Sequence, residues 1–223
     1  MRLLIVIPTL DEAKNLEELL PEALRLADEV CVADGGSRDG SPEIARRLGA
    51  RVVEAPRGRG RQLQAGAAGS HCDLLLFLHA DTRLPADARQ AIETAVAGGA
   101  IGGAFRLHYG GDSRWLRLGA AIANARAALT RCPLGDHAIF VRREIFEELG
   151  GFRDWPLLED VDFARRLARR GRIVLLPSFV VTSARRFERL GMVRTVATNW
   201  LILALYWVGV SPWRLARLYR AAP

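Results

Sequence analysis

The sequence predicts an α/β protein in which a mostly parallel sheet is flanked by helices. Apolar runs at 3–7, 29–33 and 73–78 have the length and continuity of strands that are buried on both faces. Segments with helical spacing separate these runs, as in 12–27, where apolar residues recur every three or four positions. A chain that alternates strands and helices in this way places its helices on both faces of a parallel sheet.

The other elements follow in order along the chain. We expect Pro8 to stop the first strand, because proline has no N–H for the ladder. The run 51–54 is a short third strand, and the helix before it, 41–48, has Pro42 in its first turn. The remaining expected elements are a helix at 62–68, a helix at 85–96, a strand at 100–107, a helix at 115–129, a strand at 138–141, a helix that contains 163–167 and ends before Gly171, and a strand at 173–176.

The carboxy-terminal part differs in character from the rest. Residues 181–223 hold seven arginines and one acid, Glu188, whereas the whole chain has a net charge of +7. The most apolar stretch, 192–210, is interrupted by Arg194, and its uninterrupted part is shorter than the roughly 20 residues of a spanning helix. We therefore expect a domain at 1–180 and a helical extension at 181–223.

Two settings suit this extension. Its tryptophans and arginines are typical of a helix at a membrane interface, which suggests peripheral contact with an anionic membrane surface. A helix that packs on its own core or on a partner in a homodimer is the alternative, and the composition leaves both open. Arginine content alone also suits nucleic acid, but the arginine-rich loop at 57–61 has no interleaved aromatic residues, so we expect no nucleic-acid partner.

Composition excludes several classes of protein. Half of the 223 residues are apolar and about a quarter are charged, which excludes a disordered chain and a collagen-like repeat. The three cysteines, Cys31, Cys72 and Cys132, have no metal-binding spacing and form no disulfide framework. The apolar run at 3–7 is too short for a signal peptide. We expect a cytoplasmic protein, with the extension on the inner face of the membrane.

Three polar clusters follow predicted strands. They lie at 8–12, 34–39 and 79–82, each directly after an apolar run. The carboxyl ends of parallel strands meet at one edge of a sheet, and ligands bind there. The sequence therefore predicts that these clusters converge on one binding site.

Each cluster contains residues suited to a phosphorylated ligand. Asp34 and the glycines after it can approach a nucleoside closely. His79 and Asp81 can hold a divalent cation, since Mg²⁺ and Mn²⁺ favour one or two carboxylates together with phosphate oxygens. Ordinary structural roles, a glycine turn for Asp34 and a helix cap for Asp81, remain alternatives at this point.

Two further motifs bear charge. A predicted helix begins with three acids, Glu159, Asp160 and Asp162. Acids at this position are stabilised by the helix dipole. Their crowding can also raise the pKa of one of them, which prepares that residue as a general base. The glycine-rich segment 57–61 carries three arginines, whose guanidinium groups match phosphate geometry. It has neither a phosphate-binding lysine loop nor a complete dinucleotide fingerprint.

Together these motifs resemble, in order and spacing, the family 2 glycosyltransferases of the GT-A fold. The segments that carry the resemblance are 5–12, 32–41, 77–82, 140–143, 149–152 and 159–162. The segment 183–188, Ser-Ala-Arg-Arg-Phe-Glu, resembles a subgroup associated with selenium or radical-SAM domains.

The resemblance implies an inverting transferase that moves a sugar from a nucleotide-diphospho-sugar to an acceptor hydroxyl with the help of Mn²⁺ or Mg²⁺. It implies nucleotide contacts from Pro8, Thr9, Glu12 and Asp34, a diphosphate contact from Arg61, metal binding by Asp81 with His79, and a general base in Asp160 with Glu159 beside it. The acceptor is undefined, and the extension suggests a lipid-linked one.

Two departures from the family pattern bear on specificity. Gly35 stands where the family has a second acid, which leaves uridine and guanosine recognition open. His79 stands where the family has the first acid of the metal motif, and imidazole favours Mn²⁺ over Mg²⁺. Two other functions remain as alternatives: a GT-A-like nucleotidyltransferase, and a catalytically degenerate membrane-associated protein that binds nucleotide-sugars.

Overall fold

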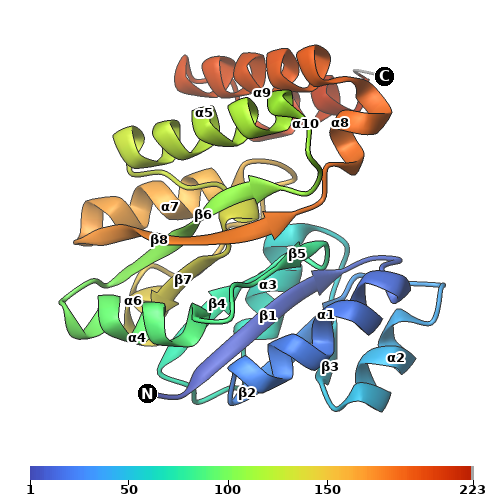
Figure 1. The fold of residues 1–223 in the computed structure, drawn as a ribbon, viewed down its shortest axis with the longest axis vertical. Coiled ribbons are helices and arrows are strands. Elements are labelled where there is room, and N and C mark those ends of the chain that lie inside the picture. The colour runs from blue at the N-terminus through green and yellow to red at the C-terminus, as the bar shows by residue number, and fades with distance from the viewer. Residues whose placement is uncertain (222–223) are drawn as a thin grey trace.

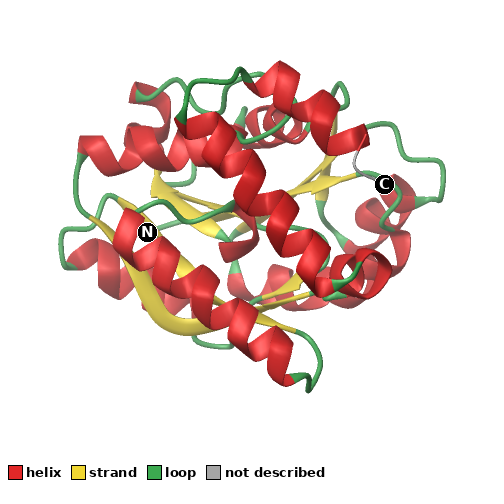
Figure 2. Cartoon of the chain, turned by 90° about the horizontal axis from the view of Figure 1, so that it is seen from above, coloured by secondary structure: helices red, strands yellow, loops and turns green. Residues whose placement is uncertain are grey.

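The computed structural model describes residues 1–221 and shows a curved sheet with helices on both sides (Figures 1 and 2). The strands are β1 (Leu3–Thr9), β2 (Glu29–Asp34), β3 (Arg51–Glu54), β4 (Leu74–Phe77), β5 (Thr82–Arg83), β6 (Gly102–Tyr109), β7 (Ile139–Arg142) and β8 (Ile173–Thr182). The helices are α1 (Ala13–Leu26), α2 (Ser41–Leu48), α3 (Arg59–Ala67), α4 (Ala88–Ala97), α5 (Arg114–Thr130), α6 (Arg143–Glu148), α7 (Glu159–Arg170), α8 (Arg185–Leu190), α9 (Met192–Trp207) and α10 (Pro212–Ala221), with a 3-10 turn at Gly135–His137.

The sheet is mostly parallel, as the sequence predicts. Its strand order is β3-β2-β1-β4-β7-β6-β8-β5. The first four strands of this order are parallel to one another, β6 and β8 are also parallel, and β7 and β5 pair antiparallel to their neighbours. The carboxyl ends of β2, β1 and β4 therefore lie side by side at one edge.

Strand β1 explains why both faces of the sheet are covered. Leu3, Ile5 and Ile7 pack into a core that includes α1, α2 and α4. Leu4 and Val6 point to the opposite face and pack with α3, α6 and α7. A continuous apolar run is the pattern expected of such a two-sided strand.

The expectation that Pro8 stops the first strand is wrong. Strand β1 continues to Thr9, with Pro8 opposite Ala33 of β2. The carbonyl of Val6 accepts a hydrogen bond from Leu78, so alternate residues of β1, Pro8 included, direct their backbone groups towards β4. Strand β4 ends at Phe77, so the missing N–H of proline interrupts no ladder.

Two other elements extend beyond their predicted ends. Helix α3 begins at Arg59, so Arg59 and Arg61 of the arginine-rich segment lie in its first turn, whereas Arg57 and Gly58 precede the helix. Strand β8 passes Pro177 and ends at Thr182, because the register with β6 shifts between Phe105 and Arg106 and accommodates the proline.

The carboxy-terminal helices lie on the second half of the sheet (Figure 1). Ile202 of α9 and Leu215 of α10 are buried in an apolar cluster with Val161 and Ala164 of α7. The predicted domain boundary at residue 180 falls inside β8. Among the described residues, none of the helices has both the length and the hydropathy required to cross a bilayer.

Close packing of α3 against the sheet places its first turn at the strand ends. A Cβ on Gly66 would lie 2.4 Å from Cγ1 of Val6 and 3.3 Å from Cβ of Ala33, both in the sheet. Only a glycine at this position lets the helix approach β1 and β2 so closely.

Gly66→Ala is expected to lower the free energy of unfolding by about 1–3 kcal/mol, because the buried Val6 side chain cannot move aside freely. Gly119→Ala is the matched control: a Cβ there meets nothing nearer than 3.8 Å, and alanine is the better helix former. Urea unfolding of both variants checks this. Equal stability of the two variants would contradict the packing argument.

Candidate active site

Side-chain and backbone hydrogen bonds hold the ends of β1 and β2 together. Nε2 of Gln62, in α3, donates to the carbonyl oxygens of Thr9 at 2.7 Å and Ala33 at 2.9 Å. The backbone N–H of Gly35 donates to the same Thr9 carbonyl at 2.9 Å. Gln62 thus fixes the floor of the predicted nucleotide pocket, a role that the sequence analysis did not assign to it.

Asp34 lies in this floor with its carboxylate turned into its own loop. Its Oδ2 accepts hydrogen bonds from the backbone N–H groups of Gly36 at 2.8 Å and Ser37 at 3.0 Å, and Oδ1 accepts one from the Ser37 hydroxyl. The side chain is buried. Asp34 therefore shapes the loop that the sequence predicts to face the nucleobase.

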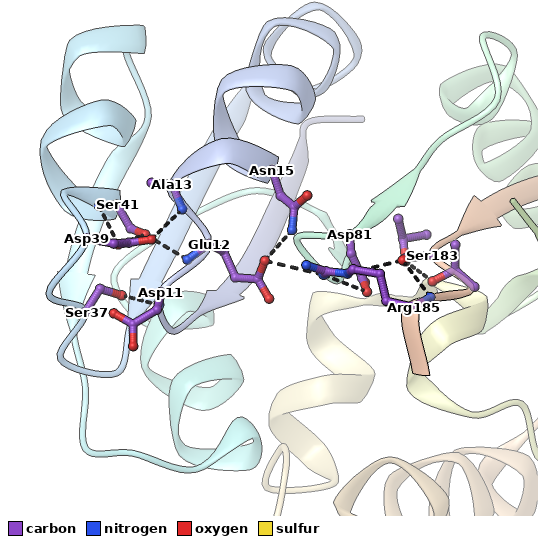
Figure 3. A network of polar contacts seen from close by, with 12 residues as sticks. Asp11, Glu12, Ala13, Asn15, Ser37, Asp39, Ser41, Asp81, Ser183 and Arg185 are labelled. Carbon is purple, nitrogen blue, oxygen red and sulfur yellow. Dashed lines mark hydrogen bonds and ion pairs between the residues drawn. The ribbon is translucent and has the colours of Figure 1, made fainter. Parts of the chain in front are cut away.

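The loop after β2 is fastened to the loop after β1 (Figure 3). Asp39 accepts from the backbone N–H of Ala13 at 2.8 Å, and the Ser41 hydroxyl accepts from the N–H of Glu12 at 3.0 Å. Asp11 and Ser37 are joined by a further bond, from Asp11 N to Ser37 Oγ at 2.9 Å. These contacts give the two loops a fixed separation.

The third cluster joins the first at a shared cavity. The lining of this cavity includes Pro8, Thr9 and Glu12 from the first cluster, His79 and Asp81 from the third, and Arg59 and Gln62 from α3. The structure therefore brings the clusters at 8–12 and 79–82 to one cavity, whereas residues 34–37 of the remaining cluster line a separate cavity. Thr9 contributes mainly backbone, because its side chain is buried and its hydroxyl donates to the Ile7 carbonyl.

A second cavity continues from the same strand end towards α7. It has a volume of about 260 Å³. Its polar lining includes Arg59, His79, Asp81, Asp136 and Asp160. The structure therefore brings the predicted metal residues and the predicted base to one space.

Arg59 holds the acidic start of α7. Its guanidinium hydrogen-bonds the carboxylate of Glu159 and lies 3.5 Å from Oδ2 of Asp160. Burial raises the pKa of Glu159 above its usual value; the charge of Arg59 opposes that rise, and Asp160 adds to it. Glu159 is almost fully buried, which makes it a partner for Arg59 more than a group that meets substrate.

Asp160 is oriented by two backbone donors. Its Oδ2 accepts from the N–H of Gly135 at 2.7 Å, and Oδ1 accepts from the N–H of Val161 at 2.8 Å. A carboxylate has about four lone-pair sites, so these bonds leave capacity for an acceptor hydroxyl. The carboxylate is thus fixed in position and still able to accept a proton.

Gly135 brings Asp160 and His79 close together. A Cβ on Gly135 would lie 2.9 Å from Nε2 of His79 and 3.2 Å from Oδ2 of Asp160. Burial and the charge of Arg59 lower the pKa of His79 below its usual value, against the opposing charges of Asp136, Asp81 and Asp160. The imidazole is therefore neutral at pH 7.

The side chains present do not fit a divalent cation as they are placed. The carboxylate of Asp81 already forms an ion pair with Arg185, whose Nη2 lies 3.3 Å from Oδ2. Within residues 1–221, no group of three or more His, Cys, Asp or Glu side chains could hold a metal ion. A cation on His79 and Asp81 would lie against the guanidinium of Arg185.

Arg61 lies away from these cavities. Its guanidinium pairs with Asp154 through two bonds of 2.6 Å, at the surface. Arg59, two positions earlier on the same helix turn, is the arginine that lines both cavities. The sequence pattern indicates an arginine here but does not distinguish between the two positions.

The lining of the second cavity, the one that contains Asp160, includes a carboxylate atom without a partner among the described residues. Oδ1 of Asp136 is buried and makes no hydrogen bond with the described residues. The same cavity is lined by Asn199 and Leu203 of α9 and by Tyr219 of α10. The carboxy-terminal helices therefore form part of the candidate site.

Comparison with known proteins identifies the family. The model of the family described as glycosyl transferase family 2 matches residues 4–150. The chain belongs to this family. Succinoglycan biosynthesis protein ExoA of Rhizobium meliloti is 30% identical over 195 residues, which cover 75% of this chain and 58% of ExoA. This chain therefore spans little more than half the length of that relative.

Solved structures confirm the GT-A-type fold. S. aureus TarS 1-349 superposes with a TM-score of 0.66 at 17% identity, over 91% of this chain and 66% of TarS. Glucosyl-3-phosphoglycerate synthase of Mycobacterium tuberculosis, in complex with Mn²⁺, UDP and glucosyl-3-phosphoglycerate, gives a TM-score of 0.60 at 23% identity, over 90% of this chain and 78% of the synthase. The finer resemblance to the selenium- or radical-SAM-associated subgroup stays a prediction.

Proposed function

We propose that this chain transfers a sugar from a nucleotide-diphospho-sugar to an acceptor hydroxyl with inversion, and that Asp160 is the general base. The observation that carries the proposal is that Asp81, in the segment between β4 and β5, and Asp160, at the start of α7, line one cavity. Family membership supports the donor class, and solved neighbours hold UDP or UDP-GlcNAc.

The reaction uses the two sides of the cavity differently. The nucleotide lies along the ends of β1 and β2, near Pro8, Thr9, Glu12 and the Asp34 loop, with the diphosphate beside Asp81. Asp160 removes the proton of the acceptor hydroxyl as that oxygen bonds to the anomeric carbon. The bond from this carbon to the diphosphate oxygen breaks, and its electron pair leaves with the nucleoside diphosphate. Attack opposite the leaving group inverts the configuration.

The predicted Mn²⁺ or Mg²⁺ at His79 and Asp81 has support from neighbours that hold these ions. In this chain the Asp81 carboxylate is paired with Arg185 instead. The sequence of steps above therefore involves the side chains of this protein only.

Asp160→Asn is expected to lower the rate of nucleoside diphosphate release from the donor by about 100-fold or more, because an amide cannot take the proton. Water serves as the acceptor in this assay. Binding of the nucleoside diphosphate is expected to stay within a few-fold of wild type. Asp154→Asn, which alters an exposed carboxylate outside the cavity, is the matched control and should retain the wild-type rate.

A rate for Asp160→Asn within threefold of wild type would refute its role as the base. The released product also separates the alternatives, since a nucleotidyltransferase releases pyrophosphate. Donor binding without any turnover in the wild type would favour the degenerate binding protein.

We further infer that the carboxy-terminal helices contact an anionic membrane surface and that the acceptor is held there. Helix α9 presents an exposed stripe at helical spacing, made of Val193, Ala197, Trp200, Ala204 and Trp207. Two apolar side chains, Leu129 of α5 and Val193, are 86% and 83% exposed. A large exposed apolar face of this kind marks an interaction surface.

Charge favours a lipid surface as the occupant of this face. Helices α5, α9 and α10 contain no Asp or Glu, while arginines occur in all three, such as Arg117, Arg194 and Arg214. Ile122 of α5 and Trp200 of α9 line one groove, so the two helices present a continuous face. The same α9 lines the cavity that contains Asp160, and this supports a lipid-linked acceptor held next to the base.

Vesicle flotation tests this inference. The wild type is expected to float with phosphatidylglycerol vesicles and not with phosphatidylcholine vesicles. The double variant Val193→Ser, Trp200→Ser is expected to bind these vesicles at least tenfold more weakly. The reason is that each of the two side chains contributes about 1.5–3 kcal/mol when it is buried in the lipid. Phe179→Ser, which alters an exposed phenylalanine of β8, is the control that should bind normally. A protein that does not float and forms a dimer in light scattering would show that a second copy covers this face instead.

A further inference from the structure

Arg185 reaches across the candidate site from the second half of the chain. Its Nη2 lies 3.3 Å from Oδ2 of Asp81 and 3.5 Å from Oε2 of Glu12, and its Nε donates to the Ser183 hydroxyl at 3.2 Å. Figure 3 shows the side chain extended between Glu12 and Asp81. Both acids line the cavity at the ends of β1 and β4, so the guanidinium contacts two residues of its lining.

The fold fixes this arrangement through β5 and β8. Thr82 pairs with Thr182, and their hydroxyls are joined at 2.9 Å. The backbone N–H of Ser183 donates to the carbonyl of Asp81 at 3.1 Å. Asp81 and Arg185 are therefore held together by the sheet itself, although they lie far apart in the sequence.

The guanidinium keeps capacity for a ligand. None of its hydrogen bonds to described residues uses Nη1, and the side chain is 58% exposed. Partial burial alone would lower the pKa of Arg185, but its contacts with Asp81 and Glu12 outweigh this and raise it. Arg59, which lines the same cavity as Asp81 and Glu12, is committed to Glu159 and Asp160.

We propose that Arg185 takes the place of the divalent cation at Asp81, so that its anchored guanidinium binds the donor diphosphate and donor binding needs no added metal. This assignment rests on the proposed function. A guanidinium offers a permanent charge and paired donors that match phosphate oxygens. As the bond between the anomeric carbon and the diphosphate oxygen breaks, the electron pair passes to that oxygen, and Arg185 stabilises the charge there.

Calorimetric titration of the full chain with UDP, GDP and dTDP tests the proposal. Each nucleotide is titrated once in a buffer with EDTA and once in a buffer with Mn²⁺. The wild type is expected to bind one of them with equal affinity in both buffers. Arg185→Ala should weaken that binding at least tenfold in EDTA, and Arg185→Lys should restore part of it. Arg83→Ala, which removes an exposed arginine paired with Glu18, is the control and should bind as wild type.

Electron paramagnetic resonance of Mn²⁺ alone gives a second readout. Wild-type protein should leave the ion free, and Arg185→Ala should gain Mn²⁺ binding at the vacated Asp81 carboxylate. Nucleotide binding by the wild type only with Mn²⁺, unchanged in Arg185→Ala, would overturn the role of Arg185 and leave the proposed function standing. No binding of any nucleotide in either buffer would overturn the proposed function and, with it, this assignment.

Discussion

The ion pair between Arg59 and Glu159 joins the two halves of the molecule. Arg59 begins α3, which packs on β1 and β2, and Glu159 begins α7, which covers the second half of the sheet. Because Glu159 is almost fully buried, loss of Arg59 would leave its charge uncompensated. A Cβ on Gly60 would lie only 2.6 Å from the Arg153 carbonyl, so α3 and the segment before α7 meet closely there. This contact sets the position of Asp160 relative to the strand ends.

The two sides of the site are built by different means. On the donor side, hydrogen bonds fasten loops to one another, as Asp39 does with Ala13 and Gln62 with Thr9. On the acceptor side, apolar helices form the wall, and Oδ1 of Asp136 has no partner among the described residues. Under the proposed function, the hydrogen-bonded side would hold the nucleotide and the side formed by α9 and α10 would hold the acceptor.

The sequence predicts the first half of the fold well, because continuous apolar runs and helical spacing are local signals. Helix 41–48 and strand 51–54 have the predicted bounds. Pro8 was misleading because its effect depends on where the neighbouring strand ends, which is a property of the sheet. The predicted strand at 173–176 ends before Pro177, whereas β8 continues to Thr182. The register shift that accommodates the proline becomes visible only in the pairing with β6.

The residues of the candidate site were also only partly predictable from the sequence. Asp81 and Asp160 stand out from the sequence because they follow a strand and open a helix, and the structure brings them to one cavity. Arg59 could not be distinguished from Arg61 until the ion pair with Glu159 was known. Arg185 is about a hundred residues from Asp81, and only the pairing of β5 with β8 brings them together.

The central claim is that the ends of β1, β2 and β4 form a donor site. The binding of nucleotide-sugars tests this claim most directly. The measurement is a calorimetric titration of UDP-, GDP- and dTDP-sugars into the wild type and into Asp81→Asn. The account predicts that one nucleotide class binds to the wild type and that Asp81→Asn, with its fold intact by circular dichroism, loses this binding. Equal binding by the two proteins, or none by the wild type, would contradict it.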